Sequence, residues 1–287
     1  MFYIKHISTK SKAMEDVDYR MVNQFTYIYH PVTILSFGVV MFLYKKVFPR
    51  ISPHISESYT SLSGVQQNDW NLRMTSCVHC VVISTLCLYT LLFDDVIIQD
   101  PVWSDRSAIR ICGAIATGYF LADAAAMLMD YEQNMETVLY YFHHAATICA
   151  SYYVFTYGIL PYFANYKMMM EFSTLFVNLR WLLIKEKVKT SSKVFLVNGC
   201  LLTFTFVTTR VLSLPKFWYK IYSYIGSDDF ALLGKIPFVM IVTSFVLDSL
   251  NIYWSIRILK TFYKTMLSIV TEYTNEDNMS EKNGKHQ

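Results

Sequence analysis

Charged residues are scarce in this sequence: they make up 16% of its 287 residues, against about 25% in a typical soluble domain. The net charge is only +3, and no block of the chain concentrates it. We therefore expect no nucleic-acid partner, because such a partner requires a focused basic surface. The six cysteines lie in or beside apolar runs, which excludes a disulfide-bonded scaffold. Residues 1–20 are polar and lack an apolar core, so we expect no cleaved signal peptide.

Apolar residues, by contrast, form 54% of the chain and occur in long runs. A helix needs about 20 such residues to cross a bilayer. Seven runs are long enough to be candidate spans: Tyr27–Tyr44, Cys77–Phe93, Ile111–Met129, Val138–Gly158, Tyr162–Ile184, Val194–Leu214 and Ile236–Ile256. The fifth run is the most polar, since it contains Lys167 and Glu171. Helices are expected rather than strands, because a membrane strand spans only about 10 residues and alternates.

The parts outside these runs are short. The longest predicted loop is Phe48–Ser76, and the tail is expected to be helical to about Ile269 and disordered over Thr271–Gln287. Neither loops nor tail can hold a soluble catalytic domain, so any chemistry must lie among the membrane helices. We expect no metal and no resident cofactor.

Lysines beside the spans suggest the orientation. Lys45, Lys46 and the cluster over Lys185–Lys193 abut the first and fifth spans on one side. By the positive-inside rule we place that side, and the tail, in the cytosol and the N-terminus in the lumen. The tail carries a glycosylation sequon at Asn278, which a cytosolic tail would leave unused.

Ionisable residues inside spans indicate function, because each costs roughly 2.5–3.5 kcal/mol at the bilayer centre. They are Asp123, His143, His144, Glu171, Arg180, Arg210 and Asp248. For Arg210 with Asp248 or Asp123 we favour a structural ion pair, and for Arg180 a position at the membrane interface. For the two histidines and Glu171 we favour function, since imidazoles beside a carboxylate suit proton transfer or nucleophilic acyl transfer.

Polar residues form a stripe on each of three spans. The stripes are His144, Thr147 and Ser151; Glu171, Thr174 and Asn178; and Asp248, Asn251 and Ser255. Each set has the spacing i, i+3, i+7, which places it on one helical face. We therefore predict an all-α transmembrane bundle of about six to seven helices, with the stripes turned inward around a polar cavity. His143 borders the same cavity from a direction about 100° away around its helix.

The ensemble of motifs resembles the TLC family (TRAM, LAG and CLN homology) over roughly residues 19–262. The motifs are Trp70-Asn71-Leu72-Arg73 with Ser76 and His79, the run Gly118–Asp123, Phe142-His143-His144 with Thr147, the run Tyr157–Asn165, Glu171-Phe172-Ser173-Thr174, Phe176-Val177-Asn178 with Arg180-Trp181, Arg210, and Leu247-Asp248 with Asn251. The resemblance divides the chain into a polar segment over 1–25, a first helix and loop over 26–69, a TLC domain over 70–262 and a polar tail over 263–287.

The resemblance implies an endoplasmic-reticulum membrane protein that binds or regulates membrane lipids in lipid homeostasis. Its lipid-binding residues would be His143, His144, Thr147, Ser151, Glu171, Thr174, Asn178, Asp248 and Asn251. Ceramide synthases share the domain and use a histidine pair and acids of the next helix to transfer an acyl group from acyl-CoA. In that alternative His143, His144 and Glu171 would be catalytic, but Thr174 stands where those enzymes carry a second acid. A small-molecule transporter is the third alternative, although no matched pair of broken helices is evident.

Overall fold

The computed structural model describes residues 26–130 and 134–284, with the backbone alone over 272–284. Within these ranges every element is a helix and no strand occurs, so the predicted all-α fold is confirmed. The predicted polar segment over residues 1–25 lies outside the described ranges.

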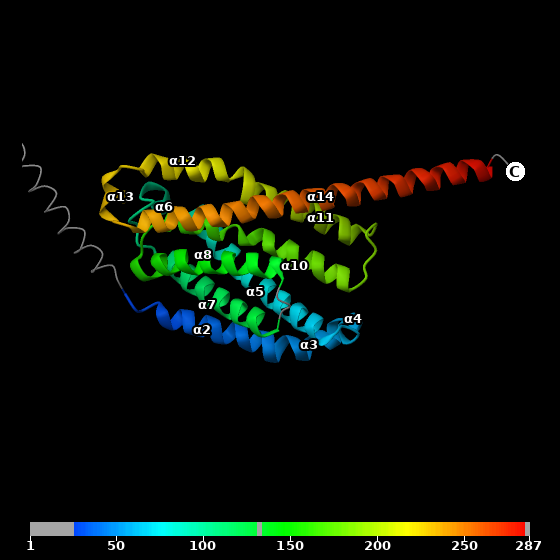
Figure 1. The fold of residues 1–287 in the computed structure, drawn as a ribbon, viewed down its shortest axis with the longest axis horizontal. Coiled ribbons are helices and arrows are strands. Elements are labelled where there is room, and N and C mark those ends of the chain that lie inside the picture. Colours follow the sequence, from blue (N-terminus) through cyan, green and yellow to red (C-terminus); the bar gives the residue numbers. More distant parts are fainter. Residues whose placement is uncertain (1–25, 131–133, 285–287) are drawn as a thin grey trace, which may run out of the picture.

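In the described residues, helical passes run back and forth along one axis, so that the start of α2 and the far end of α14 lie at opposite ends of the bundle (Figure 1). The passes are α2 (His30–Phe42) with η1 (Leu43–Val47) and α3 (Phe48–Ile55), α5 (Gly64–Phe93), α7 (Ser107–Asp130), α8 (Met135–Tyr157), α9 (Pro161–Met168) with α10 (Glu171–Lys185), α11 (Lys193–Val207) with η2 (Thr208–Leu212) and α12 (Leu214–Tyr224), and α14 (Ile236–Gly284). Short helices α4 (Glu57–Thr60), α6 (Val96–Gln99) and α13 (Asp228–Leu232) lie between passes.

Five helical stretches of the described chain are long and apolar enough to cross a membrane: His30–Ile55, Gly64–Phe93, Ser107–Asp130, Lys193–Tyr224 and Ile236–Thr271. These five stretches overlap the predicted first, second, third, sixth and seventh spans and extend beyond most of them. The predicted fourth and fifth spans, which form α8 and α9 with α10, are not among the five. The chain is therefore a membrane protein by the length and composition of its helices.

Two expectations about the connecting segments are wrong. The predicted loop over Phe48–Ser76 is mostly helical, because Ser56 caps α4 and Ser63 forms a capping box with Gln66 at the start of α5. The tail is helical to Gly284 rather than disordered from Thr271. No glycine or proline interrupts the chain between Ile269 and Gly284, and once a helix exists each added residue gains a backbone hydrogen bond.

The predicted fifth span is two helices, not one. It breaks at Met169 and Met170, between α9 and α10. The carbonyl oxygen of Met170 accepts hydrogen bonds from the Arg210 guanidinium and the Ser173 hydroxyl, both at 2.9 Å. The backbone at the break forms short i→i+3 hydrogen bonds, from Met170 N to the Lys167 carbonyl (3.1 Å) and from Phe172 N to the Met169 carbonyl (3.2 Å).

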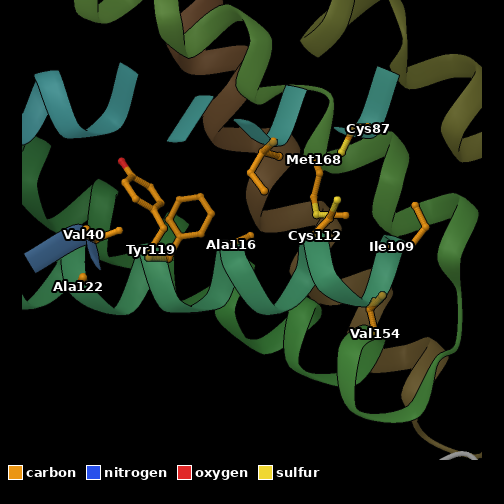
Figure 2. Close-up of a cluster of buried hydrophobic side chains, with 11 residues drawn as sticks. Val40, Cys87, Ile109, Cys112, Ala116, Tyr119, Ala122, Val154 and Met168 are labelled. Carbon is orange, nitrogen blue, oxygen red and sulfur yellow. The ribbon is translucent and has the colours of Figure 1, made fainter. Parts of the chain in front are cut away.

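Helix α7 is the centre of the bundle. In its most apolar stretch 67% of the residues are buried, against 22–39% in the other four candidate spans. Figure 2 shows the core that forms around it, in which Ala116 of α7 is buried with Val40 of α2, Cys87 of α5, Val154 of α8 and Met168 of α9. This central helix contributes small residues where its neighbours approach.

The approach of α2 to α7 depends on Gly118. A Cβ atom at this position would lie 2.4 Å from the Thr33 carbonyl oxygen and 2.6 Å from the Ser36 Cβ. Ser36 also donates a hydrogen bond to the Ile115 carbonyl at 2.8 Å. Membrane helices that pack on small residues bring their backbones close in this way. The Gly118 position thus fixes the first helix against the rest of the bundle.

Candidate functional site

A cavity lies inside the bundle between α7, α8, α9, α12 and α14. It encloses about 1000 Å³ of empty space, counting its opening to the surface. On α14 its wall extends from Pro237 to Asn251. At a rise of 1.5 Å per residue these fourteen steps cover about 21 Å, so the cavity follows the bundle axis over much of the thickness of a bilayer.

Polar groups gather at one end of this cavity. On each of four passes the wall residue nearest the end where α8 begins is polar: His143, Glu171, Arg210 and Asn251. We call these four residues the polar cluster. The opposite end, where α14 begins, is lined by Ile221, Phe230 and Pro237 among other apolar side chains. The site is therefore amphiphilic along its length.

Arg210 organises the polar cluster. Its guanidinium is buried and donates hydrogen bonds to the Ser173 hydroxyl (2.9 Å), the Asn251 amide oxygen (2.8 Å), the Thr174 hydroxyl (2.7 Å) and the Met170 carbonyl (2.9 Å). Because the planar guanidinium carries five donors in a fixed geometry, it ties α10 and α14 to the same point.

The backbone at Arg210 is a π-helical stretch, η2, between α11 and α12. Thr208 and Thr209 donate their hydroxyls to the carbonyls of Phe204 and Thr205, a pattern that bends helices. Single-turn π-helical segments are frequent at functional sites. Here the segment directs Arg210 toward α10 and α14.

Glu171 contributes a carboxylate that few protein groups satisfy. Oε1 lies 3.7 Å from the Arg210 Nη2, and Oε2 accepts a weak hydrogen bond from the Cys80 thiol at 3.6 Å. Both contacts are long compared with a charge-assisted hydrogen bond of about 2.7–2.9 Å. The carboxylate is buried on the cavity wall, so a ligand group there would meet an acceptor with spare capacity.

The two adjacent histidines have different surroundings. His144 turns away from the cavity: Nδ1 lies 2.5 Å from the Tyr140 carbonyl and Nε2 lies 2.6 Å from the Asp123 carboxylate. A carbonyl only accepts, so Nδ1 carries a proton, and one further proton lies between Nε2 and Asp123. The His144–Asp123 pair is thus neutral overall, which is how buried charges are tolerated.

His143 faces the cavity instead. Its ring contacts Phe120 and Trp254 edge-on, with centroids 5.7 Å away in both cases. Its Nδ1 is buried and has no hydrogen-bond partner among the described residues. A buried polar atom without a partner is costly and uncommon, and this nitrogen is also closed to solvent in the described structure.

The predicted pairing of Arg210 with Asp248 or Asp123 is wrong. Asp248 instead forms an ion pair with Lys167 (Nζ to Oδ1, 2.5 Å) and accepts a hydrogen bond from Trp218 Nε1 at 2.9 Å. Asp123 is paired with His144. Each of these carboxylates meets a donor that approaches closely from a neighbouring helix, which only the tertiary packing determines.

The structure places five of the predicted lipid-binding residues on the cavity wall: His143, Thr147, Ser151, Glu171 and Asn251. The other four lie behind the wall: His144, Thr174, Asn178 and Asp248. Thr174 is bonded to Arg210, and Asn178 accepts a hydrogen bond from Arg73 at 3.3 Å. Lys167 and Ser244 also line the cavity, although neither was among the predicted site residues. A lysine inside an apolar run was the sequence signal for Lys167.

No group of three or more His, Cys, Asp or Glu side chains is arranged to hold a metal ion in the part of the chain that the structure describes. The cavity wall supplies two cationic side chains, a carboxylate, an imidazole, three hydroxyl groups and one side-chain amide among apolar residues.

Comparison with known proteins identifies the family. The TLC domain model matches residues 69–260. The chain is 34% identical over 232 residues to TLC domain-containing protein 4-B of Danio rerio, which covers 80% of this chain and 88% of that protein. It is 32% identical over 242 residues to TLC domain-containing protein 4 of Homo sapiens, which covers 84% of this chain and 92% of that protein. The chain belongs to the TLC domain family, and the resemblance seen in the sequence is confirmed.

Proposed function

We propose that this protein binds a membrane lipid in the central cavity and thereby takes part in lipid homeostasis in an endoplasmic-reticulum-type membrane. The head group would lie against the polar cluster and the acyl chains along the apolar wall. The observation that carries this proposal is the division of one cavity into a polar end and an apolar end. Ligand sites are typically apolar with a few placed polar groups, and this cavity has that composition.

The polar cluster suits a head group that both donates and accepts hydrogen bonds. Glu171 and the free His143 Nδ1 supply groups that few protein atoms satisfy. Arg210, by contrast, donates its hydrogen bonds to residues of α10 and α14 and holds these two helices together at the cavity wall. With the tail in the cytosol, the apolar part of the cavity would extend toward the lumenal half of the membrane.

Filling the cavity tests this proposal. Ala150 lines the cavity from α8, and Ala145 lies on the exposed side of the same helix. We expect Ala150→Phe to lower the amount of lipid that copurifies with the protein, measured by mass spectrometry per mole of protein. The matched Ala145→Phe variant should retain lipid as the wild type does. Equal lipid content in both variants would show that the copurifying lipid lies elsewhere.

A second candidate function is a ceramide-synthase-type N-acyltransferase that uses acyl-CoA. One observation favours it: His143 and Glu171 both line the cavity, and the Nδ1 atom of His143 has no hydrogen-bond partner among the described residues. The imidazole could accept the acyl group from the thioester, or a proton from the attacking amine. Against it, Thr174 occupies the position of the second acid and its hydroxyl is already bonded to Arg210.

The enzyme function is tested with purified protein, a long-chain acyl-CoA and a sphingoid base. If it holds, wild type forms an amide and releases free CoA thiol, and His143→Ala abolishes both. Absence of product from folded wild type under these conditions, with lipid still bound in the cavity, would leave lipid binding as the function and refute acyl transfer from acyl-CoA.

A further inference from the structure

A second groove lies at the other side of α10, between α10, α11 and α14. It encloses about 540 Å³, counting its opening. Its lining comprises Val177, Arg180, Gly199, Leu202, Thr203, Arg257, Ile258, Thr261 and Phe262. None of these residues lines the central cavity, so the groove is a separate site. Two arginines within a wall of this size are its most distinctive chemical feature.

Arg180 lies half-buried in this groove without an acid. Its guanidinium lies over the Phe195 ring, 4.5 Å from the centroid. A Cβ on Gly199 would be 3.4 Å from its Nη1, so the bare glycine leaves room for the guanidinium. In the ranges that the structure describes, Arg180 has no ion pair and no hydrogen bond. A guanidinium withdrawn from water retains five donors that an anion can satisfy.

The second arginine differs in its neighbours. Arg257 is paired with Glu136 of α8 and lies over the Tyr253 ring. Its charge is therefore largely offset at the rim, whereas the charge of Arg180 is not. The segment Lys185–Lys193 between α10 and α11 carries four lysines and Glu186, but none of these residues lines the groove. The nine described lining residues include no acid, so the charge of the groove that no acid offsets is that of Arg180.

The position of the groove along α14 fits the depth of lipid head groups if the hydrocarbon layer begins at Ile236. From Ile236 to Arg257, α14 advances 21 residues, or about 31 Å, which matches a hydrocarbon thickness of about 30 Å. Beside the groove, α11 presents Val197, Leu201 and Phe204 outward, with exposed fractions of 57%, 40% and 68%. A phospholipid whose phosphate binds Arg180 could therefore place its acyl chains against this apolar face of α11.

We propose that this groove binds the phosphate of an anionic phospholipid, with the Arg180 guanidinium as its principal ligand. Arginine pairs with phosphate through two parallel hydrogen bonds, and basic pockets between membrane helices are typical sites for anionic head groups. Arg257 and Thr261 line the groove from α14, and the Thr261 hydroxyl donates its hydrogen bond to the Arg257 carbonyl at 2.8 Å, so Arg180 would supply the main donors to a phosphate.

The test uses the full-length protein in phosphatidylcholine nanodiscs with or without phosphatidic acid, analysed by native mass spectrometry. Wild type should retain phosphatidic acid in preference to phosphatidylcholine. Because a hydrogen bond to a charged group is lost, Arg180→Gln should weaken that retention about tenfold or more. Arg180→Lys should retain part of it, since lysine keeps the charge but not the planar fork.

Arg50 provides the matched control: it is exposed, lies on α3 at the same end of the bundle, and lines neither cavity. Arg50→Gln should leave phosphatidic acid retention unchanged. Thr261→Leu fills the groove from the exposed side of α14 and keeps Arg180, so it tests the site even where Arg180→Gln does not fold. Wild-type retention in Arg180→Gln or in Thr261→Leu would overturn the proposal.

A further arm replaces the lipid by inorganic phosphate. Loss of bound phosphatidic acid when phosphate is added in modest excess would show that the groove recognises free phosphate. That result would overturn the proposal that its ligand is a phospholipid. Retention in the presence of phosphate supports the lipid head group. The Ala150→Phe variant should bind phosphatidic acid at this groove as wild type does, which separates this proposal from lipid binding in the central cavity.

Discussion

Replacing Arg210 by methionine removes the centre of the polar cluster while keeping an apolar side chain of similar length. The change breaks four hydrogen bonds to α10 and α14 and leaves Glu171 buried without its cation. Hydrogen bonds between membrane helices average about 0.6 kcal/mol each, so four give a lower bound of about 2.4 kcal/mol. Removing one partner of a buried ion pair costs about 3–5 kcal/mol. We expect Arg210→Met to lower the free energy of unfolding by about 2.5–5 kcal/mol.

The assay is reversible unfolding of the purified protein in mixed micelles with increasing SDS, followed by circular dichroism. The double variant Arg210→Met with Glu171→Gln removes the unpaired charge and should recover part of the loss. Coupling energies for residues in contact are typically about 0.5–3 kcal/mol. A loss below about 1 kcal/mol in the single variant, the value of one ordinary hydrogen bond, would refute the structural role assigned to Arg210.

Three further predictions concern packing, the cavity and topology. Gly118→Ala places a methyl group 2.4 Å from the Thr33 carbonyl and should destabilise the fold by about 1–3 kcal/mol in the same SDS titration. The control is Gly38→Ala, whose added methyl group would meet nothing within 4 Å. Equal stability of the Gly118→Ala and Gly38→Ala variants would contradict the close approach of α2 to α7. In a background without native cysteines, Ser151→Cys on the cavity wall should react with a small polar thiol reagent, whereas Asn178→Cys, which does not line the cavity, should not. Faster reaction at residue 178 than at residue 151 would contradict the assignment of Ser151 to the cavity wall. The tail sequon should carry no glycan in cells, and a glycan there would place the tail in the lumen.

The sequence predicted the spans because apolar length is a requirement of the bilayer itself. The sequence also carries a signal for the start of α5, because Ser63 and Gln66 have the spacing of a capping box. The prediction of a loop over Phe48–Ser76 did not take that signal into account. The break at Met170 was not predictable in the same way. The Met170 carbonyl at the break accepts a hydrogen bond from the Arg210 side chain, which is 40 residues away in the chain.

In the candidate site, too, some features could be predicted from the sequence and others could not. Helical periodicity placed Thr147, Ser151 and Asn251 on inward faces, because residues three, four and seven apart share a face. Periodicity does not decide which of two adjacent histidines faces the cavity, nor which acid meets which base. The pairs His144–Asp123 and Lys167–Asp248 join helices whose relative rotation only tertiary packing sets.

The central claim is that the cavity holds a lipid with its head group at the polar cluster, and a cryo-EM map of the protein in lipid nanodiscs tests it most directly. We predict elongated density between α8, α9 and α14 that ends in a head group beside His143 and Glu171. Density that is absent from the cavity, or a head group located at the opposite end beside Phe230 and Pro237, would contradict it.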